Sequence, residues 1–195
     1  MPSSQWHPKR LVEAKLSLPT RCEERWIWWH LPTPPTRARV FADVIETNPS
    51  DVPWHTPDDT QKLLDMMSPV NREKVFVARR SGVQCVGAIY RRTRLGVQRA
   101  EVRFDDVAGC LRTASGGSSR QSILVVQGAN VRSRLLSTRE AARLMGLPET
   151  YALPANYNEA YSLIGDGLVV PVVSFLSRHL LGPLVARSEP LAVPA

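Results

Sequence analysis

The spacing of apolar and polar positions predicts helices in the second quarter of the chain. Residues 57–67 begin with a proline and two aspartates and follow a threonine. This is a typical helix start, because the hydroxyl caps the first turn and the carboxylates face the positive end of the helix dipole. A second helix is predicted after Ser68 and Pro69, running towards Arg79, and Gly82 is placed to end it.

After Gly82, the spacing of apolar residues changes from the helical period to the alternation typical of strands. Short apolar runs rich in β-branched and aromatic residues predict three strands, at 86–90, 100–104 and 123–126. The connection between the first two strands, residues 91–99, is basic, and Gly96 offers its turn.

A short capped helix is predicted after the last of these strands. Ser137 and Glu140 form a Ser-x-x-Glu capping box, good helix formers follow, and Gly146 is placed to end the helix. Arg139 and Arg143 lie four residues apart on one face, where they can together neutralise a phosphate or buried carboxylates. The simpler alternative is the charged outer face of an amphipathic helix.

Glycines also mark the C-terminal part. A tight turn at Gly165, Asp166 and Gly167 is predicted to open into a helix that has Pro171 in its first turn and ends at Gly182. A glycine-flanked turn before a helix lets a ligand approach backbone N–H groups closely, although such a turn taken alone is weak evidence for a site.

Proline and tryptophan characterise the N-terminal third. Ten of the sixteen prolines fall in the first seventy residues, which predicts extended connections interrupted by short helices. Three of the five tryptophans lie within residues 25–31. We expect them to be packing anchors, with a base-stacking platform as the alternative.

Charge separates one segment from the rest. The chain carries 25 Lys+Arg against 18 Asp+Glu, a net charge of +7. Residues 79–143 hold 13 arginines, no lysine and 4 acidic residues, hence a net charge of +9, so the remainder is net acidic. Arginine suits bidentate contacts to phosphates and bases, which favours nucleic acid as a partner over the alternative of a merely solvated face.

Cysteines and apolar runs indicate the compartment. Cys22, Cys85 and Cys110 are odd in number and widely spaced, which indicates neither a disulfide framework nor a metal site and favours a reducing environment. The N-terminus lacks a signal-peptide pattern, and the apolar run 168–173 is too short to span a bilayer. We therefore expect a cytoplasmic protein with no membrane contact.

A glycine-rich basic loop precedes the third predicted strand. Residues 107–121 combine three glycines and two arginines with several hydroxyl side chains. Glycines permit close backbone approach, and hydroxyl and guanidinium groups can contact phosphates and base edges. The residues predicted to contact DNA are Arg112, Thr113, Gly116, Gly117, Ser118 and Arg120.

The order of these segments resembles the C-terminal part of the DNA cytosine-5 methyltransferases. The family's ninth conserved block looks like R-x-R-x-L-(S/T)-x-R-E-x-A-R-L-x-G-(F/L)-P, and the positions that fit it here are Arg132, Arg134, Leu136, Ser137, Arg139, Glu140, Ala142, Arg143, Leu144, Gly146, Leu147 and Pro148. The tenth block is a Gly-Asn-(Ser/Ala/Gly)-Val turn, and residues 165–168 are similar to it, with Asp166 where asparagine is commoner. The loop 107–121 is similar to the end of the family's target recognition domain, with Cys110 in place of the usual threonine.

The resemblance implies a chemistry and a set of roles. Members of this family transfer a methyl group from S-adenosylmethionine to C5 of a flipped cytosine in double-stranded DNA. The resemblance implies that Gly165, Asp166 and Gly167 line the S-adenosylmethionine site once a catalytic half is bound. It also implies that Arg139, Glu140 and Arg143 lock the two domains of the enzyme together. The family's Pro-Cys-Gln nucleophile loop, Glu-Asn-Val segment and Phe-x-Gly-x-Gly turn do not occur in this sequence, so no catalytic residue is assigned.

These observations predict an α+β fold: a small mixed recognition domain, with a C-terminal segment that completes the doubly wound α/β methyltransferase domain. Residues 1–68 are expected to form a Pro- and Trp-rich connector that packs on the recognition domain. Residues 69–130 would form the target recognition domain and residues 131–195 the C-terminal methyltransferase segment.

The leading functional hypothesis is the recognition and domain-closing part of a DNA (cytosine-5-)-methyltransferase of the restriction-modification kind, acting at the nucleoid. It would be inactive alone and would need a catalytic methyltransferase subunit in trans. The alternatives are a non-catalytic DNA-binding module and a truncated remnant. The basic segment fits the module equally well, but a pure DNA binder has no use for the cofactor-side element at residues 165–173.

Overall fold

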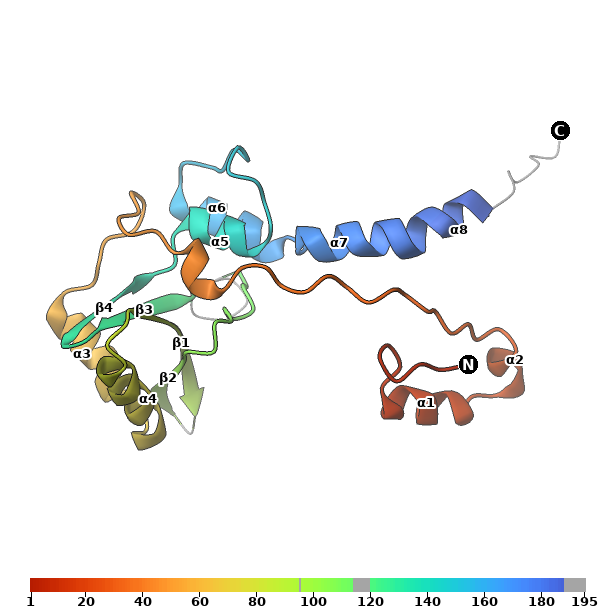
Figure 1. The fold of residues 1–195 in the computed structure, drawn as a ribbon, viewed down its shortest axis with the longest axis horizontal. Helices are drawn as coiled ribbons and strands as arrows, with labels where there is room; N and C mark the ends of the chain where they lie inside the picture. The colour runs from red at the N-terminus through yellow and green to blue at the C-terminus, as the bar shows by residue number, and fades with distance from the viewer. Residues whose placement is uncertain (95, 114–119, 188–195) are drawn as a thin grey trace. The chain divides into compact units, whose positions relative to one another are not determined.

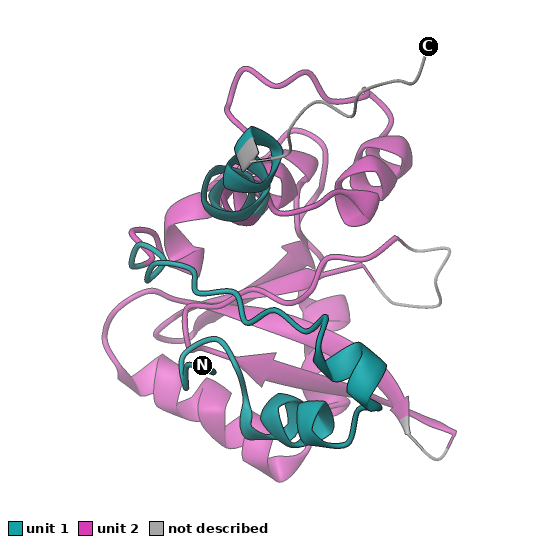
Figure 2. Cartoon of the chain, turned by 90° about the vertical axis from the view of Figure 1, so that its right-hand side faces the viewer, with its two compact units in different colours: residues 1–36, 173–195 teal, residues 37–172 magenta. Residues whose placement is uncertain are grey.

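The chain forms two compact units in the computed structural model, which describes residues 1–94, 96–113 and 120–187. One unit consists of residues 1–36 and 173–195, and the other of residues 37–172 (Figure 2). The larger unit contains the sheet and the basic segment 79–143.

A four-stranded antiparallel sheet in the order β2-β1-β3-β4 runs through the larger unit (Figure 1). Its strands are β1 (Cys85–Arg94), β2 (Val97–Arg103), β3 (Ser122–Gln127) and β4 (Asn130–Leu135). The three predicted strands are confirmed, and so is the turn at Gly96, which has the positive φ of 74° that favours glycine. The sequence does not predict β4, because arginines interrupt its apolar pattern.

Helices cover both faces of this sheet (Figure 1). On one face, α3 (Pro57–Asp65) and α4 (Pro69–Arg80) pack on a core that includes Leu63, Val75, Ile89, Val102, Leu124 and Val126. On the other face, η1 (Phe41–Val44), α5 (Thr138–Leu144) and α6 (Tyr157–Asp166) pack on a core that includes Phe41, Val86, Ile123, Leu136, Tyr161 and Ile164. Successive strand residues point to opposite faces, so β3 serves both cores. The α+β class predicted from the sequence is confirmed.

Two of the predicted helix starts are confirmed by their capping contacts. The Thr56 hydroxyl accepts the backbone N–H of Asp59 at 3.1 Å and caps α3. At α5, the Ser137 hydroxyl accepts the N–H of Glu140 at 3.1 Å, and the Glu140 carboxylate accepts the N–H of Ser137 at 2.7 Å. The capping box expected from the sequence is therefore formed in both directions.

Two predictions for the C-terminal part are wrong. Gly165 and Asp166 form no turn before a helix, because they are the last residues of α6, whose start is capped by the Asn156 side chain. Gly182 does not end the final helix: α7 (Val170–Leu176) continues through a π-helical turn at Ser177–Leu181 into α8 (Gly182–Arg187). Glycine only lowers helix propensity, so neither pattern forces a break. Pro171 does lie in the first turn of α7 as predicted.

The helical stretch from Tyr157 to Ala186 is long and apolar enough to cross a membrane by length and composition, and none of its most apolar window is buried. The expectation of no membrane contact, drawn from the unbroken run 168–173, stays a prediction. A single stretch of this kind is weak evidence for a membrane span, because core helices of soluble proteins meet the same criteria.

The smaller unit gathers the N-terminal aromatic residues. It contains α1 (Lys9–Leu16) and α2 (Thr20–Glu23) followed by an extended segment. The rings of Trp26 and Trp28 pack edge to face with centroids 5.3 Å apart, and His7 lies 4.6 Å from Trp28. These contacts agree with the interpretation of Trp26 and Trp28 as packing anchors, whereas Trp29 is 41% exposed. The division at residues 68/69 and 130/131 stays a prediction; the second of these points falls in the β3–β4 hairpin.

His55 gives the larger unit an expected pH dependence. Its Nδ1 lies 2.9 Å from the Ser133 hydroxyl, and burial lowers the pKa of His55 below 6.5, against the opposing effect of Asp59. The unfolded chain therefore binds a proton more tightly than the folded chain does, so stability should fall as the pH drops below about 6.5. Urea denaturation at about pH 7.5 and about pH 5.5 measures this, with His55→Gln as the control. An equal loss of stability in wild type and His55→Gln would contradict the assignment.

Candidate nucleic-acid interface

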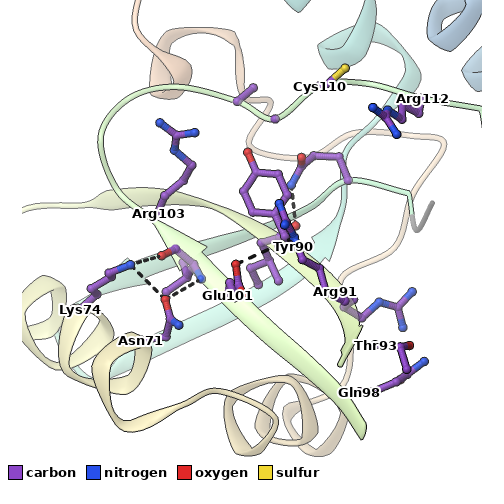
Figure 3. Close-up of a pocket in the computed structure, with 16 residues that line it drawn as sticks. Asn71, Lys74, Tyr90, Arg91, Thr93, Gln98, Glu101, Arg103, Cys110 and Arg112 are labelled. Carbon is purple, nitrogen blue, oxygen red and sulfur yellow. Dashed lines mark hydrogen bonds and ion pairs between the residues drawn. The ribbon is translucent and has the colours of Figure 1, made fainter. Parts of the chain in front are cut away.

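A basic groove of about 1200 Å³ runs along β1 and β2 of the larger unit (Figure 3). Residues of α4, β1 and β2 line it, together with residues 108–110, Arg112 and Gln121. Its charged lining residues are five cations and one carboxylate: Lys74, Arg91, Arg92, Arg103, Arg112 and Glu101. A concave surface with this excess of positive charge suits the phosphate backbone of a nucleic acid.

Helix α4 closes one side of the groove through a polar contact with β2. The Lys74 ammonium donates to Asn71 Oδ1 at 3.1 Å and to the Val102 carbonyl at 3.0 Å, and Asn71 Oδ1 also accepts the Val102 N–H at 3.2 Å. Figure 3 shows these three groups linked. Lys74 therefore adds its charge to the groove from a fixed position.

Arg103 is held at the end of β2 by two neighbours. Its guanidinium pairs with the Asp105 carboxylate in two hydrogen bonds. Asp105, and then the Tyr90 hydroxyl, raise the pKa of Arg103 above its usual value, while Arg103 holds the pKa of Asp105 below its usual range. Asp105 therefore neutralises part of the positive charge that Arg103 adds to the groove.

The loop residues predicted to contact DNA lie on both sides of residues 114–119. Arg112 is exposed and makes no hydrogen bond or ion pair with the described residues, and Thr113 is half-buried. On the other side, Arg120 donates to Asn158 Oδ1, and its guanidinium lies 5.6 Å from the centroid of the Tyr157 ring. The predicted contacts Gly116, Gly117 and Ser118 lie outside the described residues.

Gly109 lets the loop lie directly against the floor of the groove. A Cβ at this position would overlap the Tyr90 ring and would lie 2.5 Å from Gln121 Oε1. Gln121 is itself fixed, because its Nε2 donates to the Ile89 carbonyl at 2.6 Å and to the Ser122 carbonyl at 2.9 Å. The close approach is therefore possible only for glycine.

We expect Gly109→Ala to lower the free energy of unfolding by about 1–3 kcal/mol, because the added methyl overpacks a site with a fixed neighbour. Thermal denaturation measures the effect. The matched control is Cys110→Ala at the exposed neighbouring position, which should change stability by less than about 0.5 kcal/mol. A Gly109→Ala protein as stable as wild type would mean that Tyr90 moves aside freely.

A buried ion pair links three segments of the larger unit. Arg134 on β4 donates to both carboxylate oxygens of Glu140, at 2.7 and 2.6 Å, and both side chains are 0% exposed. The same carboxylate accepts the backbone N–H of Ser137 at 2.7 Å and that of Glu46 at 2.6 Å. Trp54 covers the Arg134 guanidinium at 4.9 Å. The pair thus joins β4, the start of α5 and the segment after η1.

Arg139 and Arg143 connect α5 to its surroundings. Arg139 donates to the backbone carbonyls of Pro148 and Tyr151, at 3.4 and 3.0 Å. Arg143 pairs with Glu149 at 2.7 Å, which raises the pKa of Arg143, and it donates to the Val44 carbonyl at 3.1 Å. These contacts all lie within residues 37–172, so any locking of one methyltransferase domain to another by Arg139, Glu140 and Arg143 stays a prediction.

The three residues predicted to bind a cofactor have different surroundings. The Cβ position of Gly165 is filled by the backbone of Arg112 and Thr113, at 2.8 and 2.7 Å, so this residue does not open the helix to a ligand. Asp166 and Gly167 are exposed at the end of α6. Of the three, only Asp166 and Gly167 keep a face that a bound molecule can reach.

Sequence reasoning missed several residues of the interface. Tyr90, Lys74 and Asn71 lie in predicted elements, but only the folded sheet brings α4 beside β2 and the loop beside β1. Arg134 fits the ninth block, but its burial could not be predicted. An arginine in a basic run is usually exposed to solvent. Arg132 and Arg134 are two residues apart on β4 and both lie against Trp54, so strand periodicity does not separate the exposed arginine from the buried one.

No metal centre is formed by the described residues: within 1–94, 96–113 and 120–187, no three His, Cys, Asp or Glu side chains are grouped so as to hold an ion. The groove is lined by cationic, amide and hydroxyl side chains, together with Glu101 and Cys110. Its excess of cations suits an anionic polymer.

Comparison with known proteins identifies the family. The model of the C-5 cytosine-specific DNA methylases matches residues 43–181. The type II methyltransferase M1.ScrFI of Lactococcus lactis subsp. cremoris is 32% identical over 60 residues, which are 31% of this chain and 15% of that protein. M.DsaV of Dactylococcopsis salina is 33% identical over 60 residues, 31% of this chain and 17% of that protein. M.NlaX of Neisseria lactamica is 28% identical over 68 residues, 35% of this chain and 22% of that protein.

The family model thus covers most of this chain, whereas the three relatives match 31–35% of it and a small part of their own length. The matched segments span between 15% and 22% of the length of these three methyltransferases. No solved structure shows significant similarity to the chain. Because the family match includes most of the 195 residues, together with the sheet, the groove and α5 and α6, the chain belongs to the C-5 cytosine-specific DNA methylase family.

Proposed function

We propose that this chain is the DNA-contacting and domain-closing part of a DNA cytosine-5 methyltransferase. The observation that carries the proposal is the basic groove, which lies beside the loop 107–121 within a chain of this family. Five cations against one carboxylate would neutralise phosphates of double-stranded DNA, and Arg112 and Arg120 would contact the duplex from the two flanks of the loop.

Methyl transfer would require a catalytic half in trans. The 195-residue sequence contains no Pro-Cys-Gln motif, so the thiolate that attacks cytosine in this family would come from the partner. The relatives are named type II methyltransferases, which supports a place in a restriction-modification system.

S-adenosylmethionine, the methyl donor of the family, would be shared with that catalytic half. Asp166 and Gly167 are accessible at the end of α6, so they are the residues of this chain that we propose to face it. Gly165 would act by packing against the loop instead, because its open side is already filled.

A second candidate is a DNA-binding module without a part in methylation. One observation favours it: every residue that lines the groove belongs to a single compact unit, so the groove needs no second chain. DNA binding alone does not separate the two candidates, whereas methylation in the presence of a catalytic half does.

The DNA role is tested by titrating the purified chain into a labelled duplex at several salt concentrations. Groove contacts to phosphates predict that log K falls linearly with log salt, by about 0.9 per phosphate neutralised. Binding that is absent at low salt would reject DNA contact, and binding that does not depend on salt would reject the groove as its site.

A further inference from the structure

Helix α6 contacts both flanks of the loop that carries the predicted DNA contacts. The described residues next to 114–119 are Arg112 and Thr113 on one side, and Arg120 and Gln121 on the other. All four lie against α6.

The first flank touches α6 through its backbone. The Cβ position of Gly165 lies 2.7 Å from the Thr113 nitrogen and 2.8 Å from the Arg112 carbonyl carbon. Real side chains do not approach backbone this closely, so Gly165 is what allows the helix and the flank to meet. A rigid helix surface therefore fixes the backbone from which the exposed Arg112 side chain extends.

The second flank is held by hydrogen bonds. The Tyr161 hydroxyl accepts the backbone N–H of Gln121 at 2.9 Å, and both residues are nearly fully buried, at 2% and 5% exposed. One turn earlier on α6, Asn158 Oδ1 accepts from the Arg120 guanidinium, which also lies over the Tyr157 ring. The orientation of Arg120 is therefore set by two side chains of the same helix.

The contacting positions share one face of α6. Asn158, Tyr161 and Gly165 are separated by three and four residues, the spacing that aligns side chains along a helix. Tyr161 also packs in the core beneath the sheet, beside Ile164. Because α6 is anchored in the core, it holds the two flanks in a fixed position relative to the sheet.

We propose that α6 positions the two flanks of residues 114–119, with Tyr161 and Gly165 as positioning residues for the backbone that carries Arg112 and Arg120. This inference rests on the proposed function. It adds that the helix leading into Asp166 and Gly167 also determines how Arg112 and Arg120 meet DNA. Tyr161 and Gly165 would themselves touch neither DNA nor cofactor.

Tyr161→Phe tests the inference, because it keeps the ring and removes only the hydroxyl. Hydrogen exchange of the Gln121 amide, followed by mass spectrometry, should become at least about fivefold faster, since the amide loses its acceptor. Affinity for a duplex of about 30 base pairs should fall about fivefold at a temperature where the variant is folded. Gly165→Ala should act in the same direction. The control is Leu163→Ala on the exposed side of α6, which should leave both readouts unchanged.

A double variant separates positioning from a general loss of stability. If Tyr161 acts through Arg120, then Tyr161→Phe combined with Arg120→Ala should weaken DNA binding no more than the larger of the two single changes. Additive losses would overturn the inference, as would unchanged Gln121 exchange in Tyr161→Phe. If wild-type protein binds no DNA, the proposed function fails on that result, and the exchange measurement still decides whether α6 anchors the loop.

Discussion

Glu140→Ala should destabilise the larger unit by about 3–5 kcal/mol, the largest effect expected of any single change in the chain. The substitution leaves the Arg134 guanidinium buried at 0% exposure without its counter-charge. It also removes the acceptor of the Ser137 and Glu46 N–H groups. Because ordinary domains are stable by only about 5–15 kcal/mol, this loss would be a large share of the stability of the unit. Urea denaturation followed by circular dichroism measures the change in stability.

The matched control for this prediction is Glu149→Ala. Glu149 also pairs with an arginine, Arg143, but its side chain is 60% exposed, so the change should cost less than about 1 kcal/mol. Replacing both buried partners, Arg134→Met with Glu140→Leu, should recover part of the stability, because no charge is then left unpaired. Equal effects of Glu140→Ala and Glu149→Ala would contradict the role of the buried pair.

The second large effect concerns DNA. Arg92 and Arg112 line the groove and are exposed, and Arg112 has no partner among the described residues. Replacing both by alanine should weaken duplex binding at least about tenfold and reduce the slope of log K against log salt by about 1.8, that is, about 0.9 for each phosphate that is no longer neutralised. Fluorescence anisotropy across a salt series measures both quantities.

Arg79→Ala with Arg80→Ala is the control of equal charge. Both residues lie at the end of α4, and neither lines the groove. This pair should lower affinity only slightly, through net charge, and should leave the slope nearly unchanged. If the two double variants weaken binding equally, the protein attracts DNA through its overall charge and the groove is not the interface.

The local structure of the larger unit could be predicted where short patterns determine it. Thr56 with Pro57, and Ser137 with Glu140, each place a cap and a helix within four residues, so no distant contact is needed to form them. Strand β4 and helix α6 could not be predicted. In β4, arginines interrupt the apolar alternation that would indicate a strand. In α6, the glycines at 165 and 167 are typical of a turn, although the chain is helical as far as Asp166.

The site was less predictable than the fold because its contacts are distant in sequence. Lys74 meets Val102, and Gly165 meets Arg112, only after the sheet has formed and α6 has packed on it. Composition did indicate which segment carries the positive charge of the groove, because most of the lining cations are arginines of residues 79–143. It could not distinguish Arg112, which is exposed, from Arg134, which is fully buried.

The most direct test of the proposed function is cytosine-5 methylation in cells that express this chain with and without a catalytic half carrying the Pro-Cys-Gln loop. Bisulfite sequencing of cellular DNA gives the readout. We expect methylation at a defined sequence only when both are present, and loss of that methylation with Arg92→Ala and Arg112→Ala. Methylation by the catalytic half alone, at the same sites and to the same extent, would contradict the assignment of this chain as the part that recognises DNA.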